Sequence, residues 1–261
     1  MLINKQRIPS PHPDIRLFLL TYLSDGLRVK GYLAEPAWSQ SLPGLVYLRG
    51  GIKNVGMVRV QRIIQWASEG FVVLAPFYRG NKGGEGNEDF AGKDREDGIS
   101  AVDLLKTIPT FDSEQGIHLI GFSRGGVMAF WAAIAREEVA TVTSWNGVTD
   151  MFLTYEERVD LRRMLKRVIG GTPNKVPESY DWRTPLSKLP TLNASVLLIH
   201  GVLDEHVSIE HAYAVEKVLR ASELPVESWY FNNFHHQFPI KEQQKVLHNA
   251  AEWMKSQVKG Y

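Results

Sequence analysis

The fold is decided by the segment Ile117-His118-Leu119-Ile120-Gly121-Phe122-Ser123-Arg124-Gly125. It begins with a short, nearly continuous apolar run typical of a buried strand, and a helical pattern follows over residues 127–134. The turn between them fits G-x-S-x-G, in which a serine stands on a sharp strand-to-helix bend and the glycines prevent steric clashes. The segment therefore predicts an α/β fold with Ser123 exposed after the carboxyl end of a strand.

Apolar runs of the same kind occur on both sides of this segment, as expected for parallel strands covered on both faces. They are Leu45–Leu48, Phe71–Leu74, Val139–Val142 and Val196–Ile199. Helical patterns separate them over residues 57–67, 101–108 and 209–219. This alternation predicts a mostly parallel central sheet with helices on both faces, and ligands then bind at the carboxyl ends of the strands.

The two segments that depart from this rhythm are residues 1–44 and 149–192. In the first, Ile15–Leu23 and Leu27–Ala34 flank an Asp-Gly turn, which predicts antiparallel strands at the sheet edge. The second contains a charged helical pattern, Tyr155–Ile169, followed by Gly-Gly-Thr-Pro and further polar sequence. We interpret it as a small helical insertion that covers the site, and we expect residues 1–261 to form a single domain.

Composition excludes several functional classes. The 30 Lys and Arg against 29 Asp and Glu leave a net charge of +1, which provides no field to attract nucleic acid or anionic membrane. Without cysteine the chain has no thiol nucleophile, no disulfide and no thiolate metal site. The N-terminus does not fit a signal peptide, and no apolar stretch approaches the roughly 18 residues that span a bilayer. We therefore expect a soluble cytoplasmic protein.

A serine hydroxyl becomes nucleophilic when a histidine accepts its proton and a carboxylate orients that histidine. In the α/β-hydrolase fold the chain order is serine, acid, histidine. Asp204 follows the predicted strand at 196–199 and is the favoured acid, with Asp150 as its rival. The helix that follows Ser123 leaves backbone N–H groups free, so the Arg124 amide is a candidate donor to an oxyanion.

The candidate bases lie after a further predicted strand, Val226–Phe231. His235 and His236 are adjacent there, and spacing alone does not separate them. His200 and His206 are weaker candidates because they lie close in sequence to Asp204.

With these residues placed, the sequence from about residue 45 to residue 255 resembles the catalytic domain of the prolyl oligopeptidase family of serine peptidases. The resemblance rests on the serine motif and on segments similar to the family's loops. These are Tyr78-Arg79-Gly80, Gly83-Gly84-Glu85-Gly86, Asp94-Arg95-Glu96-Asp97, His200-Gly201 with Asp204 and Val207, and Phe231 to Phe238. The last segment is similar to the family's aromatic-to-His-x-Phe segment, and this likeness selects His236.

The resemblance also implies a second oxyanion donor, either a backbone amide or a tyrosine hydroxyl, near Leu48-Arg49-Gly50-Gly51, where the family has His-Gly-Gly. Gly50 and Gly51 permit close backbone approach, but Arg49 departs from the pattern. Arg49 has two interpretations, binding an anionic substrate group or pairing with a surface acid. Family peptidases commonly carry a propeller domain, which the roughly 40 residues before the first parallel strand are too few to encode.

The predicted activity is acyl transfer to water, with Ser123 as nucleophile, His236 as general base and Asp204 as its orienting carboxylate. No metal or organic cofactor is required, and the expected substrate is a small molecule or short peptide. A peptidase and a carboxylesterase share this chemistry, and a non-catalytic binding protein of the same fold is the alternative from another class. Four aromatic residues have two alternative roles, lining an acyl pocket or packing in the core. They are Trp145, Phe152, Tyr155 and Trp182.

Overall fold

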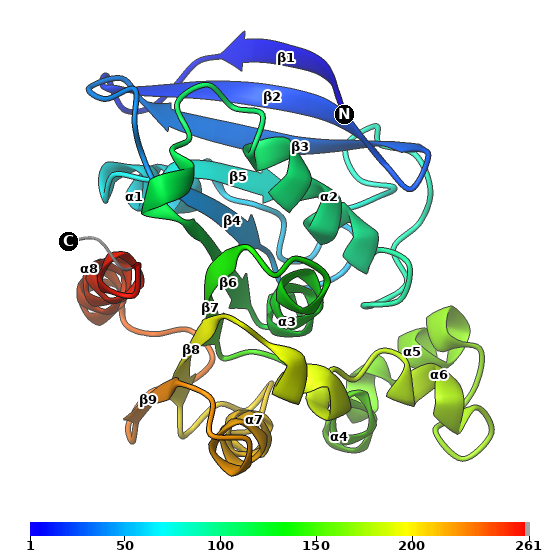
Figure 1. Ribbon diagram of the computed structural model, residues 1–261. Helices are drawn as coiled ribbons and strands as arrows, with labels where there is room; N and C mark the ends of the chain where they lie inside the picture. Colours follow the sequence, from blue (N-terminus) through cyan, green and yellow to red (C-terminus); the bar gives the residue numbers. More distant parts are fainter. Residues whose placement is uncertain (259–261) are drawn as a thin grey trace.

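The computed structural model describes residues 1–258, so the last three residues of the expected domain lie outside the described part of the chain. Nine strands form one sheet in the order β1-β2-β3-β5-β4-β6-β7-β8-β9 (Figure 1). The strands are β1 (Leu2–Ile8), β2 (Ile15–Ser24), β3 (Leu27–Pro36), β4 (Gly44–Leu48), β5 (Val72–Pro76), β6 (Ile117–Phe122), β7 (Val139–Trp145), β8 (Ser195–Gly201) and β9 (Val226–Phe231). From β5 to β9 all neighbours are parallel, which confirms the predicted fold class.

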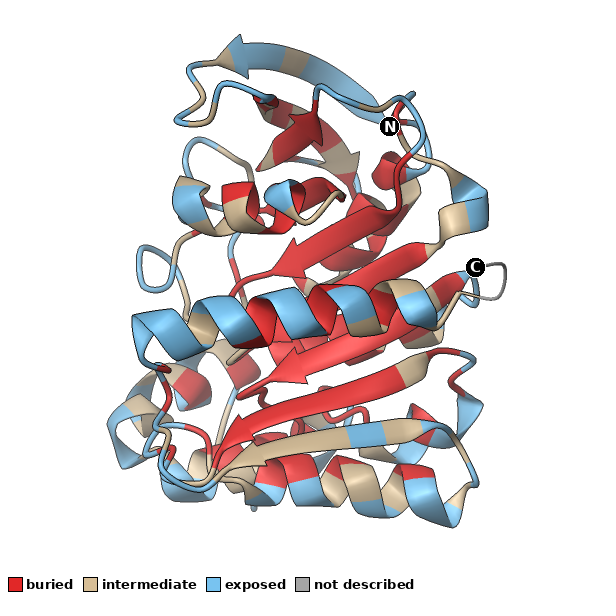
Figure 2. Ribbon diagram, turned by 90° about the vertical axis from the view of Figure 1, so that its left-hand side faces the viewer, coloured by how far each residue is buried: buried red, intermediate tan, exposed pale blue. Residues whose placement is uncertain are grey.

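Helices cover both faces of this sheet. On one face α1 (Val60–Ser68) and α8 (Ile240–Ser256) pack against the sheet. On the other lie α2 (Arg95–Leu105), α3 (Gly125–Ala135) and α7 (Glu210–Ala221). Figure 2 shows buried strands running through the middle of the molecule behind helices that expose their outer sides. No helix among residues 1–258 combines the length and apolar character needed to cross a bilayer.

The N-terminal strands are antiparallel. β2 and β3 form a hairpin whose turn residues, Asp25 and Gly26, have φ values of 48° and 76°, as a type I′ turn requires. β3 pairs antiparallel with β5 and so joins the hairpin to the parallel sheet. β1 has no counterpart among the strands predicted from the sequence, because most of its side chains are exposed and backbone pairing with β2 defines it.

The predicted helix over residues 155–169 is wrong, because the chain divides there. The elements of this region are α4 (Met151–Glu157), the 3-10 helix η2 (Val159–Leu161), α5 (Arg162–Ile169), α6 (Pro177–Asp181) and the 3-10 helix η3 (Leu186–Thr191). Arg158 interrupts the helix with φ −96° and ψ 72°. Its guanidinium donates hydrogen bonds to both carboxylate oxygens of Asp160 at 2.9 and 2.7 Å, which stabilises the bend.

A buried ionic cluster joins the loops at the carboxyl end of the sheet. The Glu88 carboxylate, in the loop after β5, accepts hydrogen bonds from Arg49 after β4 at 2.7 Å and from Arg124 after β6 at 2.6 Å. All three side chains are 1% exposed. Arg124 also contacts Asp94 at 3.1 Å, and the two arginines flank the ring of Tyr78. Two cations and two carboxylates thus balance within the core, which is the condition for burying such charges.

We expect Glu88→Gln to lower the free energy of unfolding by about 3–5 kcal/mol, because two buried guanidinium groups lose the carboxylate that they share. Chemical denaturation of the purified variant measures this. Glu85→Gln is the matched control in the same loop, because Glu85 pairs with Arg28 at the exposed surface and should change stability little. Equal stability of the two variants would contradict the prediction.

Candidate active site

Ser123 occupies a backbone conformation that non-glycine residues rarely adopt. It lies between β6 and α3 with φ 56°, in the left-handed region. Its N–H donates to the Trp145 carbonyl at 3.1 Å, and its own carbonyl accepts from the amides of Gly126 and Val148, both at 2.9 Å. These bonds to β7 and the loop that follows hold the turn and leave the Ser123 side chain facing a cavity.

Three glycines make this turn possible by allowing backbones to approach closely. A Cβ on Gly121 would lie 2.1 Å from the Gly125 carbonyl oxygen, and one on Gly125 would lie 1.9 Å from the Leu48 oxygen. A Cβ on Gly50 would lie 2.7 Å from the Cβ of Ser123. The first two positions are the glycines of the G-x-S-x-G motif, and the third brings the turn after β4 directly against the serine.

Asp204 and His236 are joined by a hydrogen bond of 2.7 Å between Oδ2 and Nδ1. The other carboxylate oxygen of Asp204 accepts from the amides of His206 and Val207, at 2.8 and 3.0 Å. Burial alone raises the pKa of this carboxyl group, but the hydrogen bonds from His236 and from the two amides outweigh it and leave the pKa below its ordinary value. Asp204 is therefore an anion at neutral pH, and it fixes the orientation of the His236 ring.

The rival residues are engaged elsewhere. Asp150 caps α4 by accepting from the amides of Phe152 and Leu153 at 2.7 and 3.2 Å. His235 is exposed, with its Nδ1 3.1 Å from a Glu205 oxygen. His200 is buried, and its Nε2 lies 2.8 Å from the Val207 carbonyl oxygen.

Ser123 and His236 line the same cavity, which has a volume of about 440 Å³. Within residues 1–258 no hydrogen bond joins their side chains, so the Nε2 of His236 is not engaged by Ser123 in this state. The His236 ring lies against the rings of Phe122 and His206, with centroid separations of 5.0 and 5.1 Å. Catalytic hydrogen bonds are often long or poorly aligned in ligand-free enzymes, so this arrangement is compatible with proton transfer once substrate is bound.

The residues that line this cavity fall into two groups, according to the face of the sheet with which they pack. The part that we call the cap lobe is mostly apolar and packs with the face covered by α2 and α3. It is lined by Ile52, Phe90, Val148, Thr154, Leu161 and Met164. The part that we call the α1 lobe lies on the face covered by α1 and α8. It is lined by Tyr47, Arg59, Arg62, Trp66, Ile120 and Trp145.

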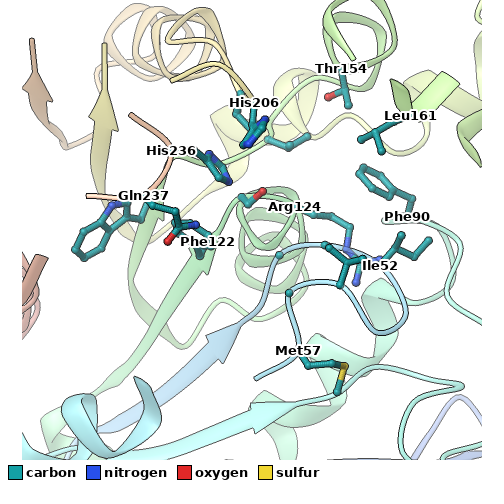
Figure 3. A pocket seen from close by; sticks show the side chains of 18 of the residues that line it. Ile52, Met57, Phe90, Phe122, Arg124, Thr154, Leu161, His206, His236 and Gln237 are labelled. Carbon is teal, nitrogen blue, oxygen red and sulfur yellow. The ribbon is translucent and has the colours of Figure 1, made fainter. Parts of the chain in front are cut away.

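The His236 ring lies against Phe122, which packs with the core on the face of the α1 lobe. Figure 3 shows His236 beside His206, with Phe122 and Gln237 on one side and Phe90 and Leu161 on the other.

Two residues that line the cavity have backbone N–H groups that are uncommitted within the described chain. The backbone amides of Arg124 and Gly51 form no hydrogen bond with any residue of the described chain, 1–258. Gly50 packs on the Ser123 side chain, so the Gly50-Gly51 turn sits beside the serine. The hydroxyl of Tyr78 is occupied, because it donates to the Arg49 carbonyl at 3.2 Å.

Arg49 takes neither of the roles that the sequence suggested. Its side chain is buried in the ionic cluster with Glu88 and donates to the carbonyls of Phe77, Gly50 and Val55, so its partners are interior groups rather than a surface acid. It does not line the cavity, and it holds the Gly50 turn in place instead.

Of the four aromatic residues considered for an acyl pocket, only Trp145 lines the cavity. Trp145 lines the α1 lobe, whereas Phe152 and Tyr155 pack against the Tyr180 ring at 5.6 and 5.8 Å. Trp182 is 44% exposed at the surface, where the Arg95 guanidinium stacks on it.

Sequence reasoning did not single out Glu88 or Arg62. The available signal for Glu88 was its place in a loop after a parallel strand, where sites of this fold assemble. Arg62 stands one turn before Trp66 on α1, so its position on the helix face toward the cavity was readable from the helical period.

Comparison with known proteins gives a consistent result. Residues 58–260 match the sequence profile of the prolyl oligopeptidase family. The chain is 57% identical over 257 residues to the "Uncharacterized peptidase YtmA" of Bacillus subtilis (strain 168), covering 98% of this chain and 100% of that protein.

Solved structures share the fold at lower identity. The acylaminoacyl peptidase of Pyrococcus horikoshii superposes with a TM-score of 0.80 at 21% identity, over 96% of this chain but only 43% of that longer chain. Acetyl xylan esterase 1 of Thermoanaerobacterium sp. JW/SL YS485 gives a TM-score of 0.75 at 15% identity, over 97% of this chain and 87% of its own. At these identities the likeness shows the fold alone.

The family profile covers most of the chain, including Ser123, Asp204 and His236. Together with the identity to YtmA over the whole length of that protein, this coverage decides the assignment. The chain belongs to the prolyl oligopeptidase family and is a serine hydrolase.

Proposed function

We propose that the protein hydrolyses a peptide or ester bond of a small substrate through an acyl-enzyme at Ser123, with His236 as general base and Asp204 as the carboxylate that orients it. The observation that carries this proposal is the 2.7 Å hydrogen bond between Asp204 and His236 beside the cavity that Ser123 lines. The three side chains come from the loops after β6, β8 and β9, which meet at the carboxyl edge of the sheet.

The reaction proceeds in two half-reactions of the same kind. The Ser123 Oγ attacks the substrate carbonyl carbon while His236 Nε2 takes the hydroxyl proton, and the carbonyl oxygen becomes an oxyanion. His236 then gives that proton to the leaving amine or alcohol as the carbonyl re-forms, which leaves an ester on Ser123. A water molecule repeats the sequence, with its proton passing through His236 to the serine oxygen, and the acid product leaves.

Electrostatics supports each stage. Asp204 stays ionised at neutral pH because its hydrogen bonds lower its pKa, so it stabilises the imidazolium that forms on His236. The amides of Arg124 and Gly51 are the proposed donors to the oxyanion, since both lie next to Ser123 with their N–H groups uncommitted among the described residues. The buried cluster around Glu88 fixes the loops that carry these amides.

The proposed substrate class is a short peptide, and the proposed location is the cytoplasm. Family membership and the peptidase name of YtmA favour amide hydrolysis. The fold shared with an acetyl xylan esterase keeps a carboxylesterase as the second candidate. A cavity of about 440 Å³ suits a small substrate, and we propose that residues 149–192, whose α4 and η2 line the cap lobe, act as a cap over it. Parallel assays on p-nitrophenyl acyl esters and aminoacyl-p-nitroanilides separate the two activities.

Ser123→Ala should abolish turnover of the better of these substrates, because no other group on the chain is proposed as nucleophile. Labelling by a fluorophosphonate probe should be lost at the same time. Ser144→Ala, at the end of neighbouring β7, is a control that keeps labelling. A wild-type protein that neither labels nor turns over would instead support a non-catalytic binding protein.

The adjacent histidines provide a matched pair of variants. His236→Ala should lower kcat by at least 10³-fold, since the general base and its hydrogen bond to Asp204 are removed. His235→Ala should stay within about threefold of wild type, because that side chain is exposed and contacts Glu205. Steady-state kinetics on one ester substrate measures both, and a larger loss in His235→Ala would overturn the assignment of the base.

Asp204→Asn should lower kcat by about 10⁴-fold with little change in KM, because the amide holds the wrong tautomer of His236. The carboxylate should also stabilise the fold. Its pKa in the folded chain lies below the unfolded value, so this stability is present above about pH 4 and is lost as the pH falls through the folded pKa.

The stability difference between wild type and Asp204→Asn should therefore be larger at pH 7 than at pH 3. Denaturation curves at the two pH values measure it. A difference that grows toward acid pH would show that the sign is wrong.

A further inference from the structure

The α1 lobe contains two arginines that no carboxylate faces. Arg59 is exposed and Arg62 is half-buried, and both line the cavity. Within the described chain, 1–258, neither side chain forms an ion pair or a side-chain hydrogen bond. The charged or titratable groups that act on Arg62 are Tyr47 and Arg59, and neither carries a negative charge at neutral pH.

The other cavity arginines differ in this respect. Arg124 binds Glu88 and Asp94, and Arg158 binds Asp160. Burial lowers the pKa of Arg62, which reflects the cost of holding a partly desolvated cation without an anion beside it. An anion that entered the lobe would remove that cost.

The Tyr47 hydroxyl adds a further donor to the lobe. The Tyr47 hydroxyl makes no hydrogen bond with residues 1–258, and burial raises its pKa, so it stays protonated and able to donate. A pocket with two cations, a free hydroxyl and no carboxylate among its lining residues is complementary to an anion.

The position of the lobe indicates which part of a substrate it meets. The His236 ring packs against Phe122 at 5.0 Å, and Phe122 packs with the core cluster that contains Tyr47 and Trp145 of the α1 lobe. Figure 3 shows Phe90 and Leu161 of the cap lobe on the other side of His236. The general acid must lie next to the leaving group in order to protonate it. The apolar cap lobe then remains for the acyl part.

We infer that the α1 lobe binds the free carboxylate of the leaving group, so that the preferred substrates are short peptides cleaved close to their C-terminus. This inference rests on the proposed hydrolase function and adds its substrate class. Arg62 is the principal contact because it is half-buried, and Arg59 contributes less because water and salt screen an exposed charge.

The test compares two leaving-group mimics that differ only in the terminal charge, the dipeptide Ala-Phe and its C-terminal amide. Their affinities are measured by isothermal titration calorimetry on the Ser123→Ala variant, which cannot turn them over. We expect the carboxylate form to bind at least tenfold more tightly, because a charge-assisted contact in a partly buried site is at stake.

Arg62→Gln in the same background should reduce that ratio to about one, and Arg59→Gln should reduce it partly. Arg163→Gln is the control and should keep the ratio, because Arg163 is an exposed residue of α5 that does not line the cavity. Thermal unfolding shows that each variant is folded. Equal affinity, or no binding, of both peptides in the Ser123→Ala protein would overturn the inference, as would a ratio that survives Arg62→Gln.

Failure of the hydrolase function is visible separately. It appears as an absence of p-nitrophenyl acetate turnover by the wild-type protein. The binding ratio is measured without catalysis, so each proposal is decided by its own readout.

Discussion

The arrangement of the site depends on one carboxylate shared by two buried arginines. Glu88 reaches from the loop after β5 to Arg49 after β4 and to Arg124 on the serine turn itself. These three loops leave the sheet side by side, and the ionic contact sets their spacing where the backbones also touch through Gly50 and Gly125. Ser123 can then keep its left-handed conformation, because the surrounding contacts over-determine it.

The sequence was sufficient where structure follows from local pattern. Continuous apolar runs located the parallel strands to within a few residues, and the Asp-Gly turn located the β2–β3 hairpin. Prediction from the sequence failed where contacts between distant residues determine the local structure. β1 depends on pairing with β2, and the bend at Arg158 depends on Asp160, so neither left a periodic signal. The C-terminal helix α8 was left unassigned, although its buried positions repeat every three to four residues.

The same distinction applies to the site. Ser123 could be predicted from its motif. The choice of His236 over His235 required the resemblance to a family, because the spacing from Asp204 does not distinguish two adjacent histidines. The burial of Arg49 could not be predicted, because its partner Glu88 lies 39 residues away in another loop. Arg62 has the appearance of an ordinary surface cation on an amphipathic helix until the cavity beside it is seen.

The acid segment has a consequence for selectivity. One oxygen of Asp204 holds the His236 ring, and the other holds the backbone of His206, whose imidazole forms part of the cavity wall. In the proposed mechanism, one carboxylate therefore holds both the general base and a segment of the cavity wall. A substrate that displaces the His206 backbone would disturb Asp204 and the His236 ring, so we expect a poor fit to lower the rate as well as the affinity.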